Sequence, residues 1–300
     1  MLKDPASIVN RWFPVARSEE VITRHVVQTQ LLGQEIAVWR DDAGRVNAWE
    51  NRCPHRGVRL SIGFNTGTEL RCQYHGWRYA TGSGQCTFIP AHPTQKPSTS
   101  IHTNVYGSME QYGFVWVHLG PQTPALPTLP TLPTLPTPAT AATLQATTLR
   151  SLFVEAPTSA VAQALLRGYR FAADPADDAG SPSEGSLSDG SMGEDSMGGA
   201  SVVAHDQFML ATADSNGRSA AVTFLLQPMT ESQTVIHGIA HAMSPAVEAR
   251  GETVAVAVTE RAAKRLALLR HHHSQMTALR DAVERALLAP TPHRVEPSTP

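Results

Sequence analysis

The chain has 300 residues, a net charge of −2 at pH 7 and a hydrophobic fraction of 41%. This length leaves room for two domains, and the balanced charge gives no basic excess of the kind that favours nucleic-acid binding. No apolar run approaches the roughly 18 residues of a membrane span, and the N-terminus lacks the features of a signal peptide. The composition therefore predicts a water-soluble globular protein in the cytoplasm, with no membrane or nucleic-acid partner.

Residues 21–120 have the pattern of short strands. Residues 35–39 and 45–49 alternate between apolar and polar side chains, and the segment Asp41-Asp-Ala-Gly44 between them has turn chemistry, which predicts a hairpin. The apolar run at 114–117 predicts a buried strand that closes the unit. We therefore expect a small antiparallel β-sandwich with two loops at one end.

Two short segments that carry both cysteine and histidine follow this hairpin. Cys53 and His55 are two positions apart in the first, and Cys72 and His75 are three positions apart in the second. In a Rieske [2Fe-2S] centre, two cysteines hold one iron and two histidines hold the other. Two facing loops with one cysteine and one histidine each supply this set of ligands. The four residues therefore predict one [2Fe-2S] cluster, and with it one-electron transfer.

A zinc site is the alternative for these four side chains. Structural zinc sites also use two cysteines and two histidines, but they usually place both cysteines in one pair and both histidines in the other. The mixed pairs and the strand-like flanks favour the cluster. The third cysteine, Cys86, follows the turn at 82–84 and has no thiol left to pair with, so we expect a packed free thiol.

The composition changes after residue 120. Residues 126–137 repeat Leu-Pro-Thr four times, and proline favours extended, polyproline-like chain, so we assign 121–148 to a linker. Residues 179–201 are rich in Gly, Ser and acids, which predicts an insertion without a core. These breaks divide the chain into a domain at 1–120 and a second region at 149–300.

The second region contains further predicted elements. Helical spacing of apolar residues predicts a helix at 158–170 and a long amphipathic helix, or a helix pair, at 260–288. Two apolar runs at 220–227 and 234–240 predict strands. We therefore expect an α+β fold for this part of the chain.

The first 120 residues resemble the Rieske domain of ring-hydroxylating and demethylating oxygenases. The resemblance depends on four segments, Trp12-Phe-Pro-Val-Ala-Arg17, Asn51-Arg-Cys-Pro-His-Arg-Gly57, Cys72-Gln-Tyr-His-Gly-Trp77 and Tyr112-Gly-Phe-Val-Trp-Val117. Respiratory Rieske proteins have one more cysteine in each loop, and those two cysteines form a disulfide. Val58 and Tyr74 occupy the equivalent positions here. The resemblance therefore implies the soluble, lower-potential type without a disulfide, and a shortened oxygenase catalytic domain in the second region.

The resemblance also implies a second, mononuclear iron held by two histidines and a carboxylate. The motif for this iron should lie between His118 and His205, but this interval contains no histidine. Its nearest counterpart is Asp174-Pro-Ala-Asp177, where an aspartate takes the place of the first histidine. A non-haem Fe(II) site is therefore not supported by visible ligands, and the catalytic residues are unknown.

Three other histidine groups are weak metal candidates. His237 and His241 would lie roughly 13 Å apart on a strand. The adjacent side chains of His271 to His273 would point about 100° apart on a helix. His205 and Asp206 form an isolated pair on an expected strand. We expect all of them to be solvated or satisfied in the core.

These features predict the oxygenase component, or an oxygenase-like subunit, of a Rieske non-haem iron system. It would receive electrons from a flavin or ferredoxin reductase and serve the oxidation of a small, aromatic or related substrate, as a homo- or hetero-oligomer. The missing histidine pair leaves an alternative, a ferredoxin-like carrier whose C-terminal region serves docking or assembly. A redox-sensing binding protein is a third possibility without a feature of its own.

Overall fold

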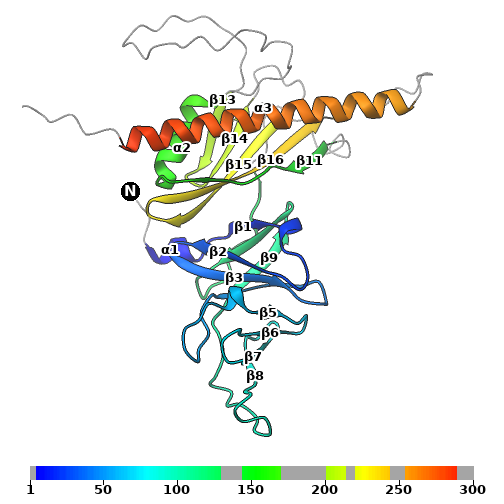
Figure 1. Ribbon diagram of the computed structural model, residues 1–300. Coiled ribbons are helices and arrows are strands. Elements are labelled where there is room, and N and C mark those ends of the chain that lie inside the picture. The colour runs from blue at the N-terminus through cyan, green and yellow to red at the C-terminus, as the bar shows by residue number, and fades with distance from the viewer. Residues whose placement is uncertain (1–4, 130–143, 170–200, 214–219, 244–253, 289–300) are drawn as a thin grey trace, which may run out of the picture.

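The structure is a computed structural model that describes residues 5–129, 144–169, 201–213, 220–243 and 254–288. Its named strands form three sheets, and every ladder between them is antiparallel. Two sheets belong to the N-terminal part, and one belongs to the C-terminal part, where two helices cover it (Figure 1). The fold is therefore mainly β at the N-terminus and α+β at the C-terminus, as predicted.

The N-terminal part begins with the short helix α1 (Pro5–Val9) and contains a larger and a smaller sheet. The larger sheet has the order β1 (Phe13–Arg17), β10 (Phe114–His118), β9 (Val105–Gln111), β4 (Val46–Glu50), β3 (Gln34–Arg40) and β2 (Val26–Leu31). The smaller sheet has the order β5 (Phe64–Asn65), β6 (Glu69–Arg71), β7 (Arg78–Ala80) and β8 (Cys86–Phe88). The 3-10 turns η1 (Ser18–Glu20) and η2 (Leu60–Ile62) connect strands. The pairing of β3 with β4 confirms the predicted hairpin.

The C-terminal sheet has the order β11 (Leu144–Thr148), β16 (Gln233–Met243), β15 (Ala220–Thr230), β14 (Met209–Ala213) and β13 (Ser201–Asp206). The short strand β12 (Leu152–Val154) also pairs with β16. Helix α2 (Thr158–Gly168) and the long helix α3 (Val254–Leu288) lie over one face of this sheet (Figure 1). Residues 144–148, which we assigned to the end of the linker, form β11 instead. The expected insertion lies outside the described residues except for Ser201, which begins β13.

The central strands β15 and β16 of the C-terminal sheet are buried on both faces, which explains their nearly continuous apolar sequence. On β15, Phe224 points toward the helices and packs in a core with Val161 of α2 and Met276 of α3. Its neighbour Leu225 points the other way and packs against Trp116 of the N-terminal sheet. The sheet therefore lies between the helices and the N-terminal part, as Figure 1 shows.

Backbone hydrogen bonds join the N-terminal and C-terminal parts. The turn between β2 and β3 places Leu32 and Gly33 in the left-handed region, with φ of 51° and 83°. Their N–H groups donate to the carbonyl oxygens of Pro228 (2.8 Å) and Met229 (2.7 Å) on β15. These bonds give the two N–H groups of the turn their acceptors, and they fix the position of the N-terminal part on the C-terminal part.

Side chains extend this contact between the two parts. Arg11 and Asp206 form an ion pair. Phe208 belongs to the hydrophobic core of the N-terminal part, where its ring lies 5.0 Å from the ring of Phe13. The C-terminal sheet is thus integrated with the N-terminal part by core packing as well as by polar contacts.

A buried polar chain crosses the same contact. Gln227 donates to Thr29 Oγ1 (3.0 Å) and to the Gln30 carbonyl (2.7 Å), so its own side-chain oxygen faces His237 Nε2 at 2.8 Å. Nε2 therefore carries the proton, and Nδ1 accepts from the Ser151 hydroxyl at 2.8 Å. Every polar atom of this imidazole has a partner only while the ring is neutral.

The pKa of His237 predicts a pH dependence of stability. Burial, with a smaller contribution from the charge of Arg17, lowers this pKa from 6.5 to about 3. Between these values the unfolded state binds more protons than the folded state, so stability falls as the pH drops below about 6.5. We expect His237 to contribute a loss of about 2 kcal/mol between pH 7 and pH 5.

Denaturant titrations followed by tryptophan fluorescence would measure this loss. His237→Gln keeps a donor and an acceptor but does not titrate, so the stability of the wild type should fall more steeply with decreasing pH than that of the variant. Equal pH slopes for the two proteins would contradict the assignment.

No helix among the described residues is long and apolar enough to cross a membrane.

Candidate iron–sulfur site

The first candidate loop runs from Cys53 to Val58, between β4 and η2. Two backbone hydrogen bonds close it: the Cys53 N–H donates to the Val58 carbonyl (2.8 Å), and the Gly57 N–H donates to the Cys53 carbonyl (2.8 Å). Gly57 has a φ of 73°, in the left-handed region that favours glycine. The turn therefore fixes Cys53 and His55 relative to each other.

The second candidate loop, from Cys72 to Trp77 between β6 and β7, closes in the same way. The Cys72 N–H donates to the Trp77 carbonyl (2.8 Å), and the Gly76 N–H donates to the Cys72 carbonyl (3.1 Å). Gly76 has a φ of 70°. Each loop thus has its cysteine and glycine four positions apart, in matching hydrogen-bonded turns.

The two imidazoles meet across the loops. His55 Nδ1 lies 3.2 Å from His75 Nδ1. Two nitrogens bound to one tetrahedral metal at about 2.1 Å would lie roughly 3.4 Å apart, so the pair has the spacing that a shared metal needs. The His55 ring stacks on Trp77 of the other loop, with centroids 4.3 Å apart and planes at 8°. Burial, then the nearby charges of His75 and Arg56, lowers the pKa of His55 and favours the neutral ring that binds metals.

The two thiols lie on the inner side of the loops. Cys53 and Cys72 are each only 3% exposed and belong to one hydrophobic cluster. Burial is the main cause that raises the pKa of Cys72, and the neighbouring Cys53 adds to it, whereas backbone N–H groups of Tyr74 and His75 act against it. The raised pKa of Cys72 makes its free thiolate costly, and a bound metal would stabilise the deprotonated form.

The four side chains therefore form a sulfur pair inside and a nitrogen pair at the surface. This arrangement fits a [2Fe-2S] cluster, because each iron needs two protein ligands. No group of three or more His, Cys, Asp or Glu within the described residues is arranged to hold one metal ion. A two-iron cluster does not require such a group, whereas a structural zinc ion needs four ligands around one point.

Tyr79 on β7 is a functional residue that we did not predict from the sequence. Its hydroxyl oxygen lies 3.1 Å from Cys53 Sγ in the buried cluster. Burial, followed by the neighbouring Cys53, raises the pKa of Tyr79, so the hydroxyl keeps its proton and can donate to a cysteine thiolate. The inward position of Tyr79 follows from the alternation of β7, but its partner comes from the distant first loop.

Cys86 is buried beside these residues, at 3% exposure. Its pKa is raised by burial above all, and its thiol lies 3.8 Å from the Phe88 carbonyl oxygen. These features match the packed free thiol that we expected.

Five histidines of the C-terminal region have described side chains, and each of them is either hydrogen-bonded within the fold or exposed. His237 belongs to the polar chain described above, and His241 lies 3.4 Å from the hydroxyl of Thr223. His272 is buried on α3, where its Nδ1 lies 2.9 Å from the Tyr169 hydroxyl. His205 and His273 are exposed, and Asp174 and Asp177 lie outside the described residues.

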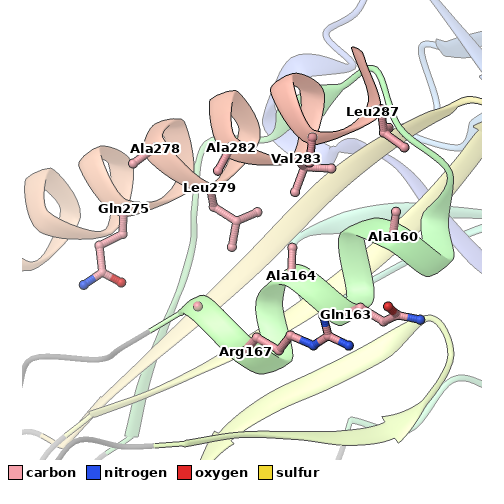
Figure 2. Close-up of a pocket in the computed structure, with 12 residues that line it drawn as sticks. Ala160, Gln163, Ala164, Arg167, Gln275, Ala278, Leu279, Ala282, Val283 and Leu287 are labelled. Carbon is pink, nitrogen blue, oxygen red and sulfur yellow. The ribbon is translucent and has the colours of Figure 1, made fainter. Parts of the chain in front are cut away.

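A groove of about 550 Å³ lies between α2 and α3 (Figure 2). Small side chains at helical spacing line it, among them Ala160 and Ala164 of α2 and Ala278 and Ala282 of α3. None of the described residues that line this groove is a His, Cys, Asp or Glu. It offers mainly apolar surface, with Gln163, Arg167 and Gln275 as its polar side chains.

Comparisons with known proteins agree with the N-terminal site. Residues 11–108 match the family model of the Rieske [2Fe-2S] domain. The chain is 58% identical to the oxidoreductase NdmD of Pseudomonas putida over 112 residues. This matched segment covers 37% of this chain and 19% of that protein. It is also 41% identical to the 4beta-methylsterol monooxygenase of Methylococcus capsulatus over 120 residues. This second matched segment covers 39% of this chain and 31% of that protein. The chain thus spans less than a third of the length of these relatives.

The fold also resembles solved structures over nearly the whole chain. The QL mutant of NdmA from Pseudomonas putida CBB5 with theobromine superposes with a TM-score of 0.60, over 97% of this chain and 85% of that chain, at 16% sequence identity. The match to the family model identifies residues 11–108 as a Rieske [2Fe-2S] domain, which implies a [2Fe-2S] cluster. The two relatives named above are an oxidoreductase and a monooxygenase, and the chain shares the fold of NdmA.

The hydrogen bond from Tyr79 to Cys53 predicts an effect on the reduction potential. A reduced cluster is more negative, so it accepts this bond more strongly, and the bond raises the potential. If the hydrogen bond to the reduced cluster is stronger than the one to the oxidised cluster by about 1–2 kcal/mol, the potential rises by roughly 40–90 mV for one electron. We expect Tyr79→Phe to lower the potential by about this amount in a redox titration.

Tyr106→Phe is a matched control, because it removes a half-buried hydroxyl from the other core of the same domain. It should leave the potential within about 10 mV of the wild type, since its hydroxyl makes no contact with the thiols. Equal potentials for Tyr79→Phe and the wild type would rule out the hydrogen bond.

Proposed function

We propose that Cys53 and Cys72 bind one iron of a [2Fe-2S] cluster and that His55 and His75 bind the other. The observation that carries this proposal is the 3.2 Å separation of the two Nδ1 atoms, above a pair of buried thiols. When bound, such a cluster accepts and releases one electron at a time. The loops hold the ligands at fixed distances, Tyr79 donates a hydrogen bond to a sulfur, and the exposed imidazole edge faces a partner.

We further propose that the chain is an oxygenase component or an oxygenase-like subunit. It would receive electrons from a flavin or ferredoxin reductase and deliver them to a non-haem iron, its own or a partner's, for the O2-dependent oxidation of a small aromatic or related molecule. The fold of the C-terminal region supports this role, as do the relatives named oxidoreductase and monooxygenase. A cytoplasmic location, assembly into homo- or hetero-oligomers, and a linker between a domain at 1–120 and a second region that begins with β11 belong to the same proposal.

An electron carrier without an iron of its own is the second candidate. The interval between His118 and His205, which contains no histidine, favours it. The integration of the C-terminal sheet with the Rieske domain favours the subunit, because a carrier needs little more than the domain that holds the cluster. The two candidates differ in the number of irons that each chain binds if the subunit has a mononuclear iron of its own.

Iron and acid-labile sulfide in anaerobically purified protein test both proposals. We expect two irons and two sulfides per chain for a carrier or for a subunit that relies on a partner's iron. A third iron without further sulfide would show that the chain has its own mononuclear site.

Variants of the ligands test the cluster assignment. Cys53→Ser and His75→Ala should lose the visible absorption and the low-temperature EPR signal of the reduced cluster, since each removes one of two protein ligands from an iron. Cys86→Ser, a matched change at a buried thiol in the same hydrophobic cluster, should keep both. If the two ligand variants retained unchanged spectra, the proposed ligands would be wrong.

A further inference from the structure

The charge of the chain is distributed unevenly. Residues 51–104, which contain both candidate loops, have six lysines and arginines and one acidic residue, Glu69, whereas the whole chain has a net charge of −2. This segment is therefore basic, and the remainder of the chain is acidic. A positive field at one end of a protein attracts negatively charged partners and raises their association rate.

Several of these cations already have a partner within the protein. Arg59 forms an ion pair with Glu35 at 2.5 Å, Arg71 lies 4.6 Å above the ring of Phe64, and Arg78 lies 3.8 Å from Glu69. Contacts within the protein therefore account for half of the six cations.

Arg52 and Arg56 are different. Both are exposed, and neither forms an ion pair or a side-chain hydrogen bond within the described residues. They lie on the two sides of the Cys53–His55 segment, so two unpaired guanidinium groups flank a candidate ligand of the cluster. Guanidinium groups suit this position because they bind carboxylates in a bidentate manner.

These two arginines line a notch of about 350 Å³ beside His55. His102, Asn104 and Glu50 also line the notch, and the Glu50 carboxylate accepts a hydrogen bond from Asn104 Nδ2 at 2.5 Å. The notch is large enough for a carboxylate side chain of another protein.

Exposed apolar side chains lie close to the second loop. Tyr74 within that loop is 57% exposed, Phe64 is 47% exposed and pairs with Arg71 next to Cys72, and Ile62 is 54% exposed. Aromatic residues together with arginine are the composition that marks the centre of protein interfaces.

We propose that this end of the Rieske domain docks onto an acidic face of an electron-transfer protein, with Arg52 and Arg56 paired to its carboxylates. This inference rests on the proposed function and specifies the partner. One electron passes from the reduced iron–sulfur or flavin group of the partner, which is oxidised, to the oxidised cluster, which is reduced. No covalent bond forms or breaks.

Stopped-flow reduction of the full-length holoprotein by a reduced, acidic plant-type [2Fe-2S] ferredoxin tests the proposal. Its potential of about −400 mV makes it a competent donor. We expect the bimolecular rate to fall at least about tenfold from low to high ionic strength, and by about tenfold at low salt in the double variant R52E/R56E. Calorimetric titration with oxidised ferredoxin should show a parallel loss of affinity.

R150E/R167E is the matched control. It makes the same change of net charge at two exposed arginines of the C-terminal region, so it should keep the rate and affinity of the wild type. R52Q/R56Q removes the two charges without reversing them, so its rate should lie between those of the wild type and R52E/R56E. This variant replaces R52E/R56E in the test if the reversed charges prevent cluster assembly. Equal effects of R52E/R56E and R150E/R167E would overturn the proposal, because only net charge would then matter.

Two further measurements separate this proposal from the proposed function. A neutral deazaflavin radical should reduce the wild type and all variants at one rate. If the radical found no reducible cluster in the wild type, the proposed function itself would be wrong. If the cluster were reducible but ferredoxin reduced R52E/R56E as fast as the wild type, only the docking proposal would be wrong. A changed association state of R52E/R56E in sedimentation would assign the surface to contact between copies and would also overturn it.

Discussion

The arrangement of the candidate site depends on two hydrogen-bonded turns that face each other. Each turn places a cysteine at its start and a left-handed glycine four positions later, and backbone hydrogen bonds within each loop fix its shape. The facing turns bury two thiols and bring two imidazole nitrogens to 3.2 Å at the surface. A cluster held in this way has its sulfur ligands in an apolar, hydrogen-bonded environment and its nitrogen ligands next to solvent and to partners, and both factors tune its potential.

The second constraint is the burial of the central strands of the C-terminal sheet, β15 and β16, on both faces. Helices α2 and α3 cover one face, and the larger N-terminal sheet covers the other, where Trp116 and Leu225 pack together. The polar chain through Gln227 and His237 crosses this contact with every hydrogen bond satisfied. Since a partly satisfied buried network would be costly, the chain specifies how the two parts sit relative to each other. The C-terminal region is therefore part of one structure with the Rieske domain.

Much of the fold could be predicted from local patterns. Alternation identified the hairpin of β3 and β4, and helical periodicity identified α2 and most of α3. The four candidate ligands followed from the spacing of Cys and His, and their assignment as ligands stays a prediction. The linker boundary was less accurate, because β11 follows proline-rich sequence and is stabilised by pairing with residues of β16 that lie 91 to 99 positions later.

Contacts between distant segments could not be predicted from the sequence. The hydroxyl of Tyr79 reaches Cys53 from another strand, Trp77 stacks on His55 from the opposite loop, and the turn at Leu32 binds β15. Each depends on how sheets pack, which no local pattern contains.

Pulsed EPR of the reduced protein, labelled with ¹⁵N-histidine, tests the central claim most directly. Coordination of one iron by His55 and His75 predicts strong couplings from the ring nitrogens of two histidines. A spectrum without any coupled histidine nitrogen, as a cluster held only by thiolates including Cys86 would give, would contradict the account.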